Sequence, residues 1–277
     1  MENDPATQLS TLGHPQRLAV FRLLMRRYPG QVPAGDLAAA LDIKASTMST
    51  YLAALQRAGL VVQTRAGTSL LYAADMTRVR QLFEYLRLDC CRGRPDLCLP
   101  LAIGDTSMSD RKYNVLFICT GNSARSIFAE SILRATAPDR FEAYSAGTNP
   151  HSSLNPFALR VLADKGYDTS PLRSKHISEF TSPDAPKFDF VFTVCDQAAN
   201  EDCPAWEGQP ISGHWGMPDP VKVTGTDAEK SLAFQQAFGA LRSRIVAFTA
   251  LPMASLDRIA LQSAVDEIGR ASTKETS

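Results

Sequence analysis

The stretch that decides the fold is Val115-Leu-Phe-Ile-Cys-Thr-Gly-Asn-Ser-Ala-Arg-Ser126. Its first four residues are apolar and predict a short buried strand, because a central parallel strand has no polar face. Residues 126–137, which follow a glycine-bearing turn, have the composition of a helix that stops before Pro138. The stretch therefore places Cys119 at the carboxyl end of a strand and over the amino end of a helix.

The turn between this strand and helix predicts an oxyanion site. Backbone N–H groups at a helix start form a concave anion site, and the guanidinium of Arg125 adds a planar fork of donors. The same positive field should lower the pKa of Cys119 below ~8.5 and make it a nucleophile. The alternative is a buried structural cysteine beside a surface arginine. The residues expected to hold the anion are Thr120, Gly121, Asn122, Ser123, Ala124, Arg125 and Ser126.

Composition limits the possible classes of protein. The chain has 277 residues, 44% of them hydrophobic, with 29 basic and 29 acidic side chains, which suits two globular domains. Its N-terminal part is mildly basic, which is compatible with nucleic-acid binding but does not prove it. No apolar run reaches ~18 residues and no signal peptide is present, so we expect a cytoplasmic protein without a membrane partner. Because the cytoplasm is reducing, the six cysteines indicate metal ligands or redox chemistry and not structural disulfides.

The N-terminal third predicts three short helices, at 15–25, 33–41 and 45–58, followed by a hairpin of strands 60–65 and 69–72. The third helix begins with small hydroxyl side chains, which suit the major groove of DNA. This pattern predicts a winged helix-turn-helix, mostly α with a β-hairpin wing, although periodicity alone fits a small helical bundle equally well. The residues expected to contact DNA are Lys44, Ser46, Thr47, Ser49, Thr50, Tyr51, Arg57 and Arg65.

Three segments of this region carry a family resemblance. They are Leu12-Gly-His-Pro-Gln-Arg-Leu18, Gly35-Asp-Leu-Ala-Ala-Ala-Leu41 and Ser46-Thr-Met-Ser-Thr-Tyr-Leu-Ala-Ala-Leu-Gln-Arg-Ala-Gly-Leu-Val61. Together they resemble the ArsR family of metal- and metalloid-responsive winged-helix repressors over residues 5–98. The resemblance implies a homodimer, formed through this domain with help from a helix at 76–87, that releases operator DNA when an inducer binds. The cysteine pair of the best-known members is absent from residues 32–37.

A different cysteine cluster follows the predicted helix 76–87. Cys90, Cys91 and Cys98 place three thiolates within nine residues, with Gly93 and Pro95 allowing the chain to fold back. Three sulfurs suit trivalent arsenic, whereas zinc requires a fourth donor and no histidine lies nearby. A similar ending occurs in a subset of arsenite-responsive family members, so arsenite is the expected inducer ligand. The alternative is that these are incidental thiols.

Beyond a linker at 99–112, strand and helix signals alternate through a second domain at 113–277. We expect strands at 141–145 and 188–194 and helices at 155–165 and 228–251. Such alternation predicts a three-layer α/β domain with an open parallel sheet, whose ligands bind at the carboxyl ends of the strands. Cys119, Cys195 and Asp219 should all lie at that edge. The N-terminal domain is then expected to cover residues 1–98.

Several motifs of this domain resemble the low-molecular-weight protein tyrosine phosphatases, and among them the arsenate reductases. The motifs are Cys119–Ser126, Ser145-Ala-Gly147, Ser174-Lys175, Thr193-Val-Cys-Asp196, Cys203-Pro204 and His214-Trp-Gly-Met-Pro-Asp-Pro220. The resemblance covers 113–265 and implies that Cys119 is the nucleophile, Arg125 the oxyanion clamp and Asp219 the general acid. Ser126 would hydrogen-bond the thiolate and Asn122 would hold the turn. Ala124 departs from many reductases, which carry a second loop cysteine there.

The remaining cysteines favour reduction over phosphate ester hydrolysis. Reduction of arsenate requires additional thiols, and Cys195 and Cys203 are spaced to supply them, although both could be structural. We expect a Cys119–Cys195–Cys203 relay without a tightly bound cofactor, re-reduced by thioredoxin or by glutathione and glutaredoxin. The predicted function is an arsenite-responsive repressor fused to an arsenate reductase. The alternatives are a DNA-tethered tyrosine phosphatase and a non-catalytic oxyanion-sensing regulator.

Overall fold

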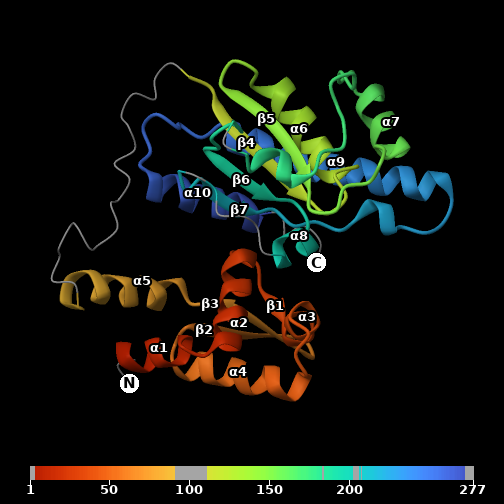
Figure 1. Cartoon of the computed structure of the whole chain (residues 1–277). Helices are drawn as coiled ribbons and strands as arrows, with labels where there is room; N and C mark the ends of the chain where they lie inside the picture. The colour runs from red at the N-terminus through yellow and green to blue at the C-terminus, as the bar shows by residue number, and fades with distance from the viewer. Residues whose placement is uncertain (1–3, 91–110, 183, 202–205, 207, 272–277) are drawn as a thin grey trace. The chain divides into compact units, whose positions relative to one another are not determined.

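The computed structural model in Figure 1 describes residues 4–90, 111–182, 184–201, 206 and 208–271. The chain divides into two compact units, Met1–Ser109 and Asp110–Ser277. Each unit has its own cluster of buried apolar side chains. The predicted linker at 99–112 lies outside the described residues except for its last two. None of the helices in the described part of the chain combines the length and apolarity needed to cross a bilayer.

The N-terminal unit consists of helices and a small antiparallel sheet. Its elements are α1 (Pro5–Leu12), α2 (Pro15–Arg27), β1 (Val32–Pro33), α3 (Ala34–Ala40), α4 (Ala45–Arg57), β2 (Val61–Ala66), β3 (Ser69–Ala74) and α5 (Met76–Tyr85). The sheet has the order β1-β3-β2, with β2 and β3 forming the predicted hairpin. Leu52 and Leu55 of α4 and Val20 of α2 are buried, whereas Leu18 of α2 is exposed. The predicted helix-turn-helix and wing are confirmed, whereas α1 and β1 were not predicted.

The C-terminal unit is a parallel sheet flanked by helices. Its strands β4 (Tyr113–Cys119), β5 (Phe141–Gly147), β6 (Phe190–Thr193) and β7 (Ile211–His214) pair in the order β5-β4-β6-β7, all in parallel. Its helices are α6 (Arg125–Thr136), α7 (Pro156–Asp164), α8 (Asp196–Asn200), α9 (Asp227–Thr249) and α10 (Arg258–Ala271). This confirms the predicted α/β fold. The short strand β7 and the helices α8 and α10 were not predicted.

The strand order determines where a ligand can bind. Strand β4 lies between β5 and β6, so the chain leaves β4 toward one side of the sheet and later returns to its other side. Such a switch point leaves a crevice at the carboxyl end of the central strand. Stacked aromatic rings support the strands beneath it, with the centroids of Phe192 and Trp215 4.0 Å apart. Cys119 ends β4 and therefore lies at this crevice.

Candidate active site

The loop between β4 and α6 surrounds the thiol of Cys119 with hydrogen-bond donors. The backbone N–H of Asn122 donates to Sγ of Cys119 over 3.2 Å, and Oγ of Ser126 lies 2.9 Å from the same sulfur. Asn122 has a φ of 41°, a left-handed conformation that asparagine tolerates better than most residues. The predicted roles of Asn122 in the turn and of Ser126 beside the thiol thus have a geometric basis.

Two glycines allow the loop to be this tight. A Cβ on Gly147, at the end of β5, would lie 2.6 Å from the carbonyl oxygen of Thr120. A Cβ on Gly121 would lie 2.5 Å from the ring of His151. Real side chains do not approach so closely, so both positions require glycine for the backbone and the histidine ring to pack as they do.

The pKa of the Cys119 thiol is raised, and the predicted lowering is wrong for this structure. Burial contributes most, and the neighbouring Cys195 thiol adds to it. Ser126 and Arg125 lower the pKa but do not overcome these effects. The sequence argument counted the positive field of the loop and left out the loss of solvation, which disfavours the charged thiolate.

Arg125, the first residue of α6, forms an ion pair with Asp219. Its Nη2 lies 2.7 Å from Oδ2 of Asp219, and the side chains are 11% and 23% exposed. A second guanidinium nitrogen donates to the carbonyl of Met217. The fold thus brings together the predicted oxyanion clamp and the predicted general acid, 94 residues apart in the chain.

Arg244 of α9 holds the segment that leads from β7 to Asp219. It donates to the carbonyl oxygens of Trp215 over 2.6 Å and of Gly216 over 3.3 Å. Burial lowers the pKa of Arg244 to about 10, which leaves it charged at neutral pH. A buried cation bound to two carbonyl groups fixes the backbone just before the predicted acid.

Cys195 lies at the same edge of the sheet, as predicted. It follows β6, is buried, and its Sγ accepts from the N–H of Ala198 over 3.4 Å as the cap of α8. Its Sγ is 3.5 Å from Oγ1 of Thr120, so a residue of the oxyanion loop contacts the second thiol directly. Cys203, the third member of the predicted relay, lies outside the described residues.

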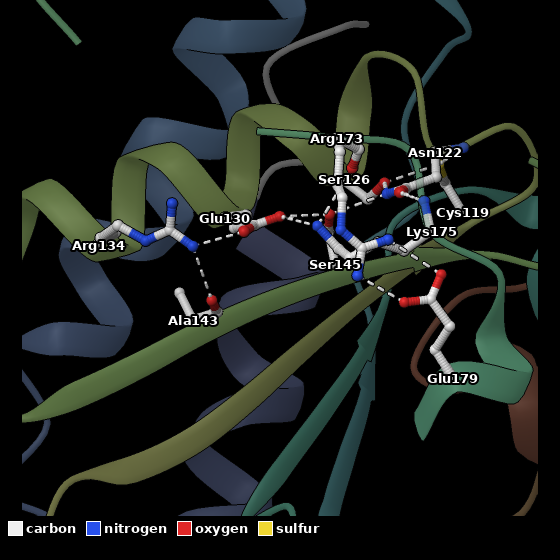
Figure 2. Close-up of polar contacts among 10 residues, drawn as sticks. All are labelled: Cys119, Asn122, Ser126, Glu130, Arg134, Ala143, Ser145, Arg173, Lys175 and Glu179. Carbon is white, nitrogen blue, oxygen red and sulfur yellow. Dashed lines mark hydrogen bonds and ion pairs between the residues drawn. The ribbon is translucent and has the colours of Figure 1, made fainter. Parts of the chain in front are cut away.

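Behind Cys119 lies a group of polar side chains that the sequence did not reveal. Figure 2 shows this buried polar network, which consists of Asn122, Ser126, Glu130, Ser145 and Lys175. Asn122 and Ser126 were predicted as loop residues, and Ser145 and Lys175 belong to the quoted motifs, but the sequence assigned no role to Glu130, whose carboxylate lies in an otherwise largely apolar stretch of helix. Its partners come from other elements and could not be identified from spacing.

The predicted DNA-contacting residues are distributed over α4, its N-cap and the wing. Lys44, Ser46, Ser49, Thr50, Arg57 and Arg65 are exposed, and Thr47 and Tyr51 are half-buried. The hydroxyls of Ser49 and Thr50 donate to carbonyls one turn earlier in their own helix. Since these hydroxyls are on the surface, they could exchange this bond for another partner. Tyr51 instead contacts Gln16 of α2.

The predicted arsenite ligands are only partly described. Cys90 is exposed at the end of a π-helical turn, Leu86–Cys90, that follows α5, while Cys91 and Cys98 lie outside the described residues. Within the part of the chain that the structure describes, no three His, Cys, Asp or Glu side chains are grouped as for a metal ion. The arsenite site therefore stays a prediction.

Comparisons with known proteins agree with this description. Residues 114–258 match the family described as low molecular weight phosphotyrosine protein phosphatase, and residues 12–64 match a helix-turn-helix domain. The chain is 37% identical over 136 residues to an arsenate reductase of Shouchella clausii, a match that covers 48% of this chain and 93% of the relative. It is 35% identical over 134 residues to an arsenate reductase of Bacillus subtilis, again covering 48% and 93%. The predicted pairing of the two folds is thereby confirmed.

Proposed function

The C-terminal unit makes this chain a member of the low molecular weight phosphotyrosine protein phosphatase family, and we propose that this unit reduces arsenate to arsenite. The observation that supports this proposal most strongly is a second buried thiol, Cys195, which contacts Thr120 of the loop between β4 and α6. Phosphate ester hydrolysis has no use for that thiol, whereas two-electron reduction requires it. The relatives described as arsenate reductases support the same activity.

The first step is an attack by the Cys119 thiolate on arsenic. The donors of the loop hold the oxyanion, and Arg125 exchanges its carboxylate partner for the substrate. A bond forms between sulfur and arsenic, and one oxygen leaves as water after Asp219 protonates it. Asp219 is already 2.7 Å from Arg125, so acid and clamp are assembled on the same side of the loop.

Reduction occurs in the second step. Cys195 attacks the sulfur of Cys119, the sulfur–arsenic electron pair passes to arsenic, and arsenite leaves as a Cys119–Cys195 disulfide forms. Both thiols are free in this structure. Cys203 then attacks Cys195, which regenerates Cys119 and moves the disulfide to Cys195–Cys203. A dithiol such as thioredoxin, or glutathione with glutaredoxin, reduces that disulfide.

Arsenate-dependent NADPH oxidation with thioredoxin and thioredoxin reductase tests this function. Wild type should turn over repeatedly, whereas Cys195→Ser should stop at the covalent Cys119–arsenate adduct and release no arsenite. Cys203→Ser should complete at most one turnover, and full multiple turnover of that variant would exclude the assigned relay. Turnover of an aryl phosphate far above arsenate reduction would instead indicate a phosphatase.

The N-terminal unit acts as a repressor in this proposal. The exposed hydroxyls and cations of α4 and the wing fit operator DNA, and arsenite held by Cys90, Cys91 and Cys98 releases it. A homodimer is supported by exposed apolar side chains on α1, on α5 and just after α5, namely Leu9, Phe83 and Leu88. Sedimentation of wild type and Phe83→Glu tests the dimer, and an operator titration with and without arsenite tests the release.

A further inference from the structure

The buried polar network contains an ion pair that the chemistry above does not use. Nζ of Lys175 lies 2.9 Å from Oε2 of Glu130, with side chains 8% and 3% exposed. Arg134 contacts the other carboxylate oxygen from the helix surface. Moving two charges from water into the protein interior often costs more free energy than their mutual attraction recovers. Such a pair is therefore weak evidence that it stabilises the fold. Its contacts with the loop suggest another role.

Lys175 fixes the orientation of the Asn122 side chain. Its backbone N–H donates to Oδ1 of Asn122 over 2.7 Å. Since a backbone N–H can only donate, the atom that faces it must be the amide oxygen, not the nitrogen. Nδ2 of Asn122 therefore points to the two hydroxyls within reach, Oγ of Ser126 at 2.8 Å and Oγ of Ser145 at 2.9 Å.

The amide orientation decides where each hydroxyl proton goes. Both hydroxyls receive a hydrogen bond from Nδ2, so each has its own proton left for another acceptor. Ser145 donates to Oε2 of Glu130 over 2.5 Å. The remaining partner of Ser126 is Sγ of Cys119 at 2.9 Å, so its hydroxyl proton is available to the sulfur when Cys119 is a thiolate. Figure 2 shows this path from Glu130 to Cys119.

The ammonium of Lys175 donates to the Glu130 carboxylate at the far end of this path. An ionised carboxylate only accepts hydrogen bonds, whereas a protonated one also donates and would compete for Ser145. Lys175 also donates to the carbonyl of Arg173, so its side chain is fixed between two acceptors.

We propose that Lys175 and Glu130 are positioning residues that direct the Ser126 hydroxyl to donate to the Cys119 thiolate. Lys175 acts at both ends, through its backbone on Asn122 and through its ammonium on Glu130. The inference rests on the proposed function of Cys119 as the nucleophile. It extends that function to a pair of residues that touch neither the oxyanion nor the sulfur.

The rate of Cys119 alkylation by iodoacetamide, followed from about pH 6 to pH 10 by peptide mass spectrometry, tests this proposal in the reduced full-length protein. Lys175→Met should slow alkylation at neutral pH about tenfold, which corresponds to an apparent pKa of Cys119 about one unit higher. Lys175→Arg should stay within about threefold of wild type, since it keeps the cation. If Lys175→Met does not fold, Lys175→Gln takes its place with the same expected direction.

Two further variants separate positioning from general damage. In Lys175→Met/Glu130→Gln no buried charge is left unpaired and the Gln carbonyl still accepts from Ser145, so alkylation should return to within about threefold of wild type. Arg173→Met removes an exposed ion pair with Glu179, two residues away from Lys175, and should change nothing. The proposal is overturned if the pH dependence of Cys119 alkylation in Lys175→Met equals that of wild type. It is also overturned if the alkylation rate does not recover in the double variant.

The experiment also distinguishes this inference from the proposed function. Alkylation and the competing binding of inorganic phosphate need no turnover, so they report the thiol and the loop even if arsenate is not reduced. The proposal expects phosphate to bind about as tightly to Lys175→Met as to wild type, because the loop donors remain. A loss of phosphate binding equal to the loss of alkylation would show a collapsed loop and overturn the positioning role.

Discussion

Ser126 acts on the ionisation of the proposed nucleophile, Cys119. Its hydroxyl, 2.9 Å from Sγ, lowers the pKa of Cys119, which burial raises. Because the nucleophile is the thiolate and its pKa is raised, arsenate reduction should increase as the pH rises above neutral. In Ser126→Ala the pKa should rise further, by about one unit. The pH dependence of kcat/KM for arsenate, with wild type and variant side by side, measures the shift.

Ser131 provides a matched control for this prediction. It lies in the same helix, is 4% exposed, and its hydroxyl makes no hydrogen bond within the described part of the chain. Ser131→Ala removes the same atoms without touching the thiol, so its pH profile should coincide with that of wild type. Coincident profiles for Ser126→Ala and wild type would show that the hydroxyl does not act on Cys119.

Asp219 has two functions that a single substitution separates. As the proposed acid it would assist the departure of oxygen, and as the partner of Arg125 it would compete with the oxyanion. Asp219→Asn should lower kcat by about 10²- to 10⁴-fold, while inorganic phosphate should bind at least as tightly as to wild type. Steady-state kinetics and phosphate inhibition measure the two effects. Asp168→Asn, an exposed turn residue, is the control, and weaker phosphate binding in Asp219→Asn would contradict the competition.

Residues of the site were predictable where the chemistry is local in sequence. Cys119 and Arg125 are six residues apart on one loop, and their geometry follows from a strand, a turn and a helix. The raised pKa of Cys119 was not predictable, because burial depends on the whole fold. Lys175 was quoted only as part of a motif and Glu130 not at all, since their contact joins residues 45 apart.

At the scale of elements, the junction of β5 with the loop between β4 and α6 leaves no room for a side chain on Gly147. A methyl group on Gly147 would meet the carbonyl oxygen of Thr120 at 2.6 Å and the Asn122 backbone at 3.1 Å. Backbone atoms cannot rotate away, so Gly147→Ala should displace the loop, cost about 1–3 kcal/mol of stability and weaken phosphate binding. Urea denaturation and phosphate inhibition measure the two losses.

Gly239 is the control for that substitution. It lies within the long helix α9, and nothing lies within 4 Å of the position that its Cβ would take. Gly239→Ala should therefore stabilise the protein by up to about 1 kcal/mol, because alanine favours a helix. Equal effects of the two substitutions would show that the contact with Thr120 does not matter.

Long elements were predicted better than short ones. Helix α9 and strand β4 carry strong apolar patterns, and their positions agree with the structure to within a few residues. Strand β7 contains serine, glycine and histidine and has no such pattern; it forms because it pairs with β6. β1 is only two residues long and is stabilised by its pairing with β3. Such elements depend on partners that lie far away in the sequence.

At the scale of the whole molecule, the two units have separate cores and separate chemistry. A covalent link between two such units places both proposed activities on one polypeptide. Here the proposed product, arsenite, is also the proposed ligand of Cys90, Cys91 and Cys98. The fusion would then let arsenate act as an inducer only after the same polypeptide has reduced it.

This coupling predicts that arsenate releases operator DNA only from a chain with an active Cys119. With arsenate, thioredoxin, its reductase and NADPH present, wild type should leave DNA, as followed by fluorescence anisotropy, and Cys119→Ser should stay bound. Both proteins should leave DNA equally when arsenite itself is added, which shows that the sensor of the variant is intact. Equal release of both proteins by arsenate would exclude the coupling, because arsenate would then act without being reduced, and each separate activity would stand on its own tests.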